Sequence, residues 1–448
     1  MKTILKWAVA AVAVAASVSA ATQKIVPYPY VQQDLPNGLR LVTVPTDFPD
    51  IVAVYIVVQA GSRNEVEPGH TGFAHLFEHL MFRGTEKYPA VLYDETMQRF
   101  GASSNAFTTD DYTCFYTVFS KDDLPTVLEM EADRFQHLKY SEAEFKTETL
   151  AVLGEYNKNS SSPFAKLDET TRETAYSVST YRHTTMGFLK DVQDMPNQYD
   201  YSLKFFDHYY RPEYTTILVI GDVRAKDARR LVDKYWGAWK RGSYRPAIPV
   251  ETVQNGPRTA HVDWPGPTLP IVRIAFKVPG YADAAPDSAA LDALAYLALA
   301  PSSDLYQKLV VQEQKADYLY GGAADRVDPS LFQITARVRK PEDVDYVRDQ
   351  ILAAVKGFQE KPPDAAKLEA VKKHLRYEAA LRMDSSDAIA AELAEYVALR
   401  RTPETMNRLY EEYAKLTAQD VQNVAAKYLV ENSRTIVTLT AAPAGGAK

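Results

Sequence analysis

Cysteine is nearly absent from this sequence of 448 residues, which contains only Cys114. A single thiol cannot form a disulfide within the chain, so a disulfide-stapled scaffold is excluded. Runs and stripes of basic residues are also absent, and the formal net charge is −7. The chain therefore lacks the electrostatic footprint that nucleic-acid binding requires.

Long apolar runs are confined to the N-terminus. Lys2 and Lys6 precede an apolar run, residues 7–16, and small residues follow it up to Ala21. This order is typical of a secretory signal, and the run is too short to cross a bilayer. We expect residues 1–20 to be a signal peptide and the mature chain to be soluble and exported, with the bacterial periplasm as its compartment. A buried N-terminal helix is the alternative.

The length of the chain predicts at least two domains, because a single hydrophobic core rarely grows this large. The segment Trp239 to Pro257 is rich in proline, glycine and charge and has neither a helical nor a strand period. Such composition is typical of an interdomain linker. We therefore expect one domain over residues 21–238 and a second over residues 258–448.

Both sides of this linker show the same order of elements, although their residues differ. On each side an apolar strand leads to a helix, and a second strand leads through a charged turn to another helix. This parallel indicates a duplicated unit. Because strands and helices do not alternate strictly, we expect two similar α+β domains, each a mostly antiparallel sheet covered by helices. The matched segments are strands 51–59 and 271–278, helices 71–81 and 288–300, strands 112–120 and 331–339, and helices 127–135 and 344–358.

The chemistry centres on residues 75–79, which read HLFEH. On a helix, His75 and His79 share one face with Glu78, so the two imidazoles can bind one metal ion and the carboxylate can serve as a general base. The surrounding residues are mostly apolar, and burying these three polar side chains without a partner is costly. A metal ion removes that cost. The alternative is a surface helix that happens to carry two histidines and an acid.

A catalytic zinc ion needs a third protein ligand and one open position. Glu148 and Glu155 lie seven residues apart on a helix predicted from Ala143 to about Asn157, so both fall on one face. We expect Glu155 to be the ligand and Glu148 to be an acid behind the ligands. A solvated acidic face is the alternative. A structural zinc site requires four protein ligands, and no fourth is evident.

These motifs resemble the pitrilysin-type metallopeptidases, a family that includes insulin-degrading enzymes and mitochondrial processing peptidases. That family pairs H-x-x-E-H, the inverse of the H-E-x-x-H order, with a glutamate ligand far downstream, which matches Glu155. Its second glutamate, seven residues earlier, matches Glu148. The resemblance extends from Leu35 to the C-terminal helices.

Residues 105–113 read NAFTTDDYT and resemble a further family segment, N-A-x-T-x-x-D-x-T. In relatives this region is an edge strand that binds the substrate backbone as an added β-strand. The resemblance therefore implies that Asn105, Ala106 and Phe107 contact the substrate. An ordinary sheet strand with a polar lead-in is the alternative.

The length is similar to that of half-sized family members, which carry two repeats and close a chamber by pairing two chains. In relatives whose site is self-sufficient, the second half carries an arginine and, seven residues later, a tyrosine that hold the substrate carbonyl. This sequence has Val310 and Asp317 there, with Tyr318 one place off. The resemblance thus implies a partner, either a related second chain in a heterodimer or a second copy in a homodimer.

Taken together, the residues and the resemblance predict a secreted or periplasmic zinc-dependent endopeptidase that cleaves unfolded peptides within a closed chamber. We expect one zinc ion per chain, because the other six histidines are not spaced as ligands. The alternative is a non-catalytic or partner-dependent subunit of a heterodimeric processing peptidase, which binds peptides or supports assembly. Degenerate subunits usually lose the motif, whereas this sequence keeps Glu78 and both histidines.

Overall fold

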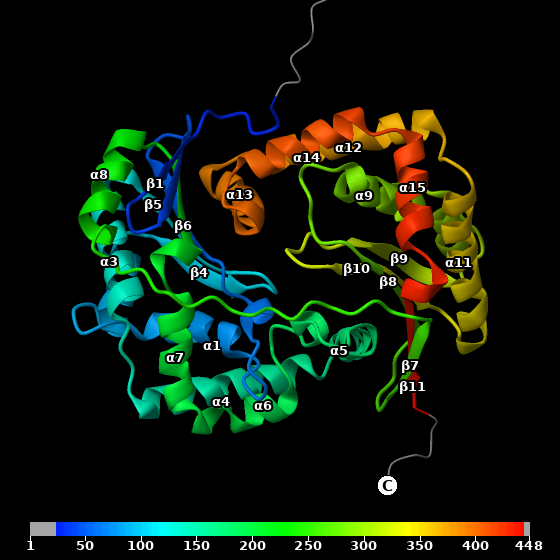
Figure 1. Ribbon diagram of the computed structural model, residues 1–448, viewed down its shortest axis with the longest axis horizontal. Helices are drawn as coiled ribbons and strands as arrows, with labels where there is room; N and C mark the ends of the chain where they lie inside the picture. The colour runs from blue at the N-terminus through cyan, green and yellow to red at the C-terminus, as the bar shows by residue number, and fades with distance from the viewer. Residues whose placement is uncertain (1–23, 443–448) are drawn as a thin grey trace, which may run out of the picture.

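A computed structural model describes residues 24–442 of the chain, and the predicted signal peptide lies outside this range. Figure 1 shows two sheets side by side, each with helices packed around it. Between α8, which ends at Trp236, and β7, which begins at Arg258, the chain has neither helix nor strand. Within the described range, no helix is both long and apolar enough to cross a membrane.

The first sheet has the strand order β1-β2-β6-β3-β5-β4, and the second has the order β7-β11-β8-β10-β9. The strands of the first sheet are β1 (Val31–Asp34), β2 (Arg40–Pro45), β3 (Ile51–Val58), β4 (Ser103–Thr108), β5 (Thr113–Ser120) and β6 (Thr215–Gly221). Those of the second are β7 (Arg258–Trp264), β8 (Ile271–Val278), β9 (Ala316–Ala323), β10 (Ser330–Val338) and β11 (Arg434–Ala441).

The duplication predicted from the sequence is confirmed by strand pairing. Apart from β1, the two sheets follow the same path: β2, β6, β3, β5 and β4 correspond in order to β7, β11, β8, β10 and β9. In each sheet one pair is parallel, β2 with β6 and β7 with β11, and the remaining pairs are antiparallel. The prediction of two similar, mostly antiparallel α+β domains is therefore correct.

The helices of the first domain are α1 (Phe73–Leu80), α2 (Ala90–Arg99), α3 (Leu124–His137), α4 (Glu142–Asn159), α5 (Pro163–Ala175), α6 (Leu189–Asp194), α7 (Tyr199–Tyr209) and α8 (Ala225–Trp236). Those of the second are α9 (Pro286–Leu299), α10 (Asp304–Tyr306), α11 (Val344–Glu360), α12 (Ala365–Arg382), α13 (Ser386–Arg400), α14 (Glu404–Lys415) and α15 (Ala418–Tyr428). The predicted helices at 71–81 and 127–135 correspond to α1 and α3 with ends shifted by a few residues.

Each sheet buries both faces, because side chains alternate between them along every strand. In β3, Val54 and Ile56 face a core formed with α1, α3 and α8. Their neighbours Ala53, Tyr55 and Val57 point to the opposite face, into a second apolar cluster that includes residues of α13. This alternation explains why β3 reads as an unbroken apolar run rather than a polar–apolar alternation.

The two domains exchange equivalent helices. α5 follows α3 and α4 in the first domain, and α13 follows α11 and α12 in the second. α13 covers a face of the first sheet, while α5 lies against the second sheet, where Leu167 packs on Ile271 and Val437. In Figure 1, α13 accordingly lies beside the first sheet and α5 beside the second. The apolar interface between the domains is thus built twice from the same element.

Shortening one buried side chain of the exchanged helix α5 tests this interface. Leu167 is fully buried, so we expect Leu167→Ala to lower the free energy of unfolding by about 2–5 kcal/mol, the usual cost of removing a buried leucine side chain. Urea unfolding followed by circular dichroism measures the change. Leu381→Ala on α12, whose leucine is 60% exposed, is the matched control and should change stability by no more than about 0.5 kcal/mol. An equal effect of the two substitutions would contradict the packing role of α5.

Candidate metal centre

Helix α1 is held firmly because it is buried on most of its circumference. Phe73, Leu76, Phe77 and Leu80 are fully buried in the core of the first domain. Glu65 provides hydrogen-bond acceptors at the start of the helix: its buried carboxylate accepts hydrogen bonds of 2.8 Å from the backbone N–H groups of residues 72 and 74. These contacts satisfy amides that a helix N-terminus otherwise leaves unpaired. The side chains on the remaining face of α1 are therefore fixed in position.

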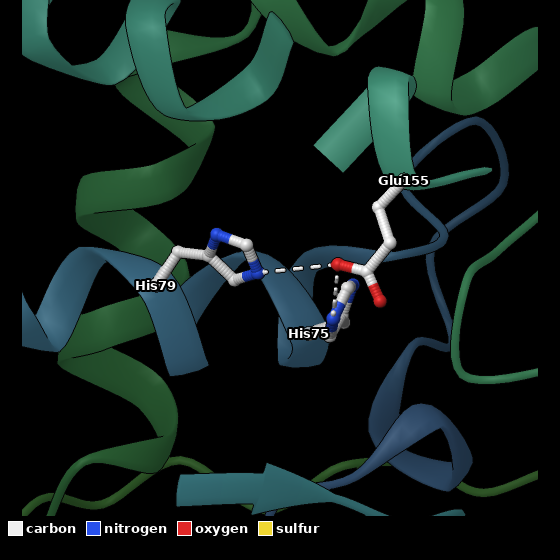
Figure 2. Close-up of side chains that lie close together, drawn as sticks. All are labelled: His75, His79 and Glu155. Atoms are coloured by element: carbon white, nitrogen blue, oxygen red, sulfur yellow. Dashed lines mark ion pairs between the residues drawn. The ribbon is translucent and has the colours of Figure 1, made fainter. Parts of the chain in front are cut away.

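His75, His79 and Glu155 converge on one point (Figure 2). An oxygen of Glu155, from α4, lies 3.5 Å from Nε2 of His75 and 3.6 Å from Nε2 of His79. Within residues 24–442, this is the one group of three such side chains whose ligand atoms all lie within 4.8 Å of one another. The structure therefore brings together the three ligands predicted from the sequence.

The spacing of these atoms matches a zinc site. Ligand atoms about 2.0–2.1 Å from a tetrahedral zinc ion lie roughly 3.3 Å from each other, close to the two observed separations. Two imidazole nitrogens and one carboxylate oxygen form the donor set of a zinc site with an open fourth position. Burial lowers the pKa of His75, which favours the neutral imidazole that a metal requires. Zinc binding itself stays a prediction.

Glu148 lies behind His79 rather than among the converging atoms. Its Oε2 is 3.3 Å from Nδ1 of His79, so the carboxylate can accept a hydrogen bond from the imidazole. Arg83 donates to the other oxygen of the same carboxylate. A carboxylate in this place fixes the ring orientation and directs Nε2 toward the metal position. The arrangement agrees with the distinct roles expected for Glu148 and Glu155.

Glu78 lies next to the end of strand β4. The hydroxyl of Thr108 donates a hydrogen bond of 2.7 Å to its Oε2. β4 is the last strand of the first sheet, so one edge of its backbone has no strand partner among the described residues. On that strand Asn105 is exposed, Phe107 is partly buried, and Ala106 is 7% exposed with its side chain in the core. A free strand edge and the carboxylate of Glu78 are therefore neighbours.

The second domain does not offer the arginine and tyrosine expected of a self-sufficient site. Val310 packs against the core of that domain. Asp317 is paired with Arg337 at 2.9 Å and with Arg339 at 3.0 Å. Arg337 also lies 4.8 Å from the ring centre of Tyr318. The carboxylate that replaces the tyrosine is thus neutralised locally.

Three side chains around the site were not singled out from the sequence: Glu65, Arg83 and Thr108. Arg83 follows His79 by four residues, so helical spacing could have indicated it (83 − 79). Thr108 lies inside the segment read as an edge strand, but its contact with Glu78 depends on how α1 packs on the sheet. Glu65 lies ten residues before His75, beyond the reach of any helical pattern (75 − 65).

Comparison with known proteins places these features in a family. Residues 40–187 match the profile described as insulinase (peptidase family M16), and residues 198–375 match that of the peptidase M16 inactive domain. The chain is similar to the zinc protease PqqE of Helicobacter pylori, with 30% identity over 90% of this chain and 91% of that protein. It is also similar to a probable mitochondrial-processing peptidase subunit beta of Arabidopsis thaliana, with 24% identity over 90% and 76% of the two chains. Among solved structures, a protease from Helicobacter pylori superposes with a TM-score of 0.86 at 29% identity, covering 93% of this chain and all of that one.

Removal of one imidazole tests the metal assignment. We expect His79→Ala to lose stoichiometric zinc, because two remaining ligands cannot hold the ion as three do. Metal analysis of the dialysed protein by mass spectrometry measures the ratio of zinc to chain. His374→Ala provides the control, since that histidine lies on α12 of the second domain and its side chain is 53% exposed. A normal zinc content in His79→Ala would contradict the site.

Proposed function

Because this chain belongs to the insulinase family of peptidases, family M16, we propose that it is a zinc-dependent endopeptidase that cleaves unfolded peptides. The observation that carries this proposal is the convergence of His75, His79 and Glu155, with Glu78 on the same helix and next to a free strand edge. A zinc ion held by these three ligands supplies a Lewis acid that polarises the scissile carbonyl and lowers the pKa of the attacking water.

Glu78 is the proposed general base. Its carboxylate takes a proton from the attacking water and returns it to the amine that leaves. The hydrogen bond that Thr108 donates orients this carboxylate. Glu148 orients His79 by accepting a hydrogen bond from the imidazole. Glu78 and His79 therefore each have a partner that limits rotation of the side chain, and such preorganisation lowers the barrier to reaction.

The substrate is proposed to bind as an added strand along β4. The unpaired edge of β4 offers backbone N–H and C=O groups to an extended peptide, and residues 105–107 flank it. Most backbone groups of a folded protein are already paired, so the edge favours unfolded peptides. Enclosure in a chamber formed by two chains would further limit the length of the substrate.

A partner chain is the second part of the proposal. The chain has the length of the half-sized members of the family, and Val310 and Asp317 stand where a self-sufficient site has its carbonyl-holding pair. An apolar side chain cannot stabilise a developing oxyanion, and a carboxylate that is already paired with two guanidinium groups offers it no hydrogen-bond donor. A homodimer repeats this deficit, so we favour a heterodimer in which a related chain supplies the missing groups. The similarity to a processing-peptidase subunit supports this choice.

A partner-dependent or non-catalytic subunit is the alternative function. The lack of the arginine and tyrosine favours it, whereas the intact set of Glu78 and the three ligands favours catalysis by this chain. We also propose that residues 1–20 direct export to the periplasm. The segment 239–257 is proposed to be the linker that connects the two domains, 21–238 and 258–448. The signal-like N-terminus and the lack of helix or strand between Trp236 and Arg258 support these two points.

The role of Glu78 can be separated from metal binding. We expect Glu78→Gln to keep its zinc and its fold but to lose peptide hydrolysis by about 100-fold or more, because an amide cannot accept the proton. The initial rate of cleavage of a fluorogenic peptide, with and without chelator, measures the effect, and zinc content serves as the internal control. Hydrolysis near the wild-type rate in this variant would show that Glu78 is not the base.

The heterodimer can be tested by purification. We expect the chain expressed alone to cleave peptides slowly and the rate to rise when a related chain from the same source is added. Analytical ultracentrifugation and the peptide assay follow assembly and activity together. Glu78→Gln mixed with the partner is the control and should stay inactive if this chain carries the site. If the isolated chain forms a homodimer whose rate no relative changes, the heterodimer is wrong, and Tyr318 and Tyr320 become the residues to replace.

A further inference from the structure

The two domains also meet through their equivalent hairpin turns. The turn between β4 and β5 covers residues 109–112, and the corresponding turn between β9 and β10 covers residues 324–329. In Figure 1 the ends of these two hairpins point toward each other from the two sheets. Residues about 215 positions apart in the sequence are hydrogen-bonded there, as the contact between residues 111 and 327 shows.

Asp110 is the centre of the contact. Its carboxylate is paired with Arg326 of the second domain at 2.8 Å and with Arg172 of α5 at 2.9 Å. It also accepts a hydrogen bond of 3.0 Å from the hydroxyl of Ser62. The Asp110 side chain is only 4% exposed. Although burial alone raises it, the two guanidinium groups hold the pKa of Asp110 at about 2, so the carboxylate stays ionised.

Asp111 extends the contact along the turn. One of its oxygens accepts a hydrogen bond from the hydroxyl of Tyr181, and the other accepts one of 3.0 Å from the backbone N–H of Val327. Asp328 is in turn paired with Arg63 at 2.6 Å. Three carboxylates, of residues 110, 111 and 328, thus meet three guanidinium groups, of residues 63, 172 and 326, and Arg172 also pairs with Asp168 at 2.9 Å.

The turn of residues 109–112 is directly connected to Thr108, which contacts Glu78. Thr108, which orients Glu78, is the last residue of β4 and lies two positions before Asp110. Within the turn, the backbone N–H of Thr109 donates to the carbonyl of Tyr112, and the hydroxyl of Thr109 donates to the same carbonyl. The turn is therefore stiff, and a displacement of Asp110 moves the end of the strand that carries Thr108.

We propose that Arg326 is a positioning residue: through Asp110, the metal-free second domain holds the end of β4 and the carboxylate of Glu78 in the orientation that hydrolysis needs. The proposal rests on the proposed peptidase function. It assigns a task to the second domain within one chain, separate from any part that it plays toward a partner. Arg326 touches neither the metal ligands nor the free edge of β4, so it acts on the reaction only through the turn.

Substitution of Arg326 tests this role with two independent measurements. We expect Arg326→Met to lower kcat about tenfold, at the low end of the effect of groups that orient a ligand or base, while KM changes little and zinc content stays normal. Hydrogen–deuterium exchange should become faster in peptides that cover residues 103–112. Arg326→Lys keeps a positive charge opposite Asp110 and should recover most of kcat, although it lacks the fork of two donors.

The matched control removes a different contact between the domains. The hydroxyl of Tyr55 on β3 donates a hydrogen bond of 2.8 Å to Asp387 of α13, and Tyr55→Phe deletes only that bond. We expect this variant to keep the wild-type kcat and the exchange rate of residues 103–112. An equal loss in Tyr55→Phe would show a general effect of domain docking and overturn the proposal.

The exchange measurement keeps the proposal testable if the peptidase function is wrong. Should the wild-type chain hydrolyse no peptide either alone or with a related chain, the proposed function fails, and faster exchange of residues 103–112 in Arg326→Met alone still supports the mechanical link. Unchanged exchange and unchanged kcat in Arg326→Met would overturn the positioning role, whatever the activity of the wild type.

Discussion

The site depends on one geometric constraint: α1 and α4 must hold three ligand atoms within a few ångströms. On α1, His75 and His79 are one helical turn apart, so their direction is set by the axis of a single helix. Glu155 comes from another helix, so the crossing of α1 and α4 decides whether a site exists at all. Phe77 packs near Tyr140, which precedes α4, and Tyr140 stacks near Phe145 inside it, so aromatic packing sets that crossing.

Duplication gave the molecule two sheets of one topology, but the two copies have different tasks. The helix that follows β3 carries two histidines and a glutamate, whereas α9, which follows β8, has no histidine and is mostly apolar and buried. The first copy therefore contributes the reactive groups. The second contributes a covering helix and a hairpin turn, both in positions where the first copy has the same element.

Local spacing explains which features could be predicted from the sequence. The ligands on α1 could be predicted because His75 and His79 are four residues apart, about one turn of a helix. The boundaries of β8 were predicted correctly because a continuous apolar run ends at Pro279 and Gly280. The contact of Thr108 with Glu78 and that of Arg326 with Asp110 could not be predicted, because each depends on how distant elements pack. The exchange of α5 and α13 could not be predicted either, because the apolar side of a helix does not indicate which sheet the helix will cover.

The exchanged helices also decide when the chain can finish folding. The face of the first sheet that carries Ala53, Tyr55 and Leu218 is covered mainly by α13, which begins at Ser386. During synthesis, the first half emerges long before that helix and leaves an apolar sheet face open to water. Such a face attracts other chains, so a chaperone that shields it until the C-terminal residues arrive would protect this protein from aggregation. Completion of the fold is in this sense a property of the whole chain and of neither half alone.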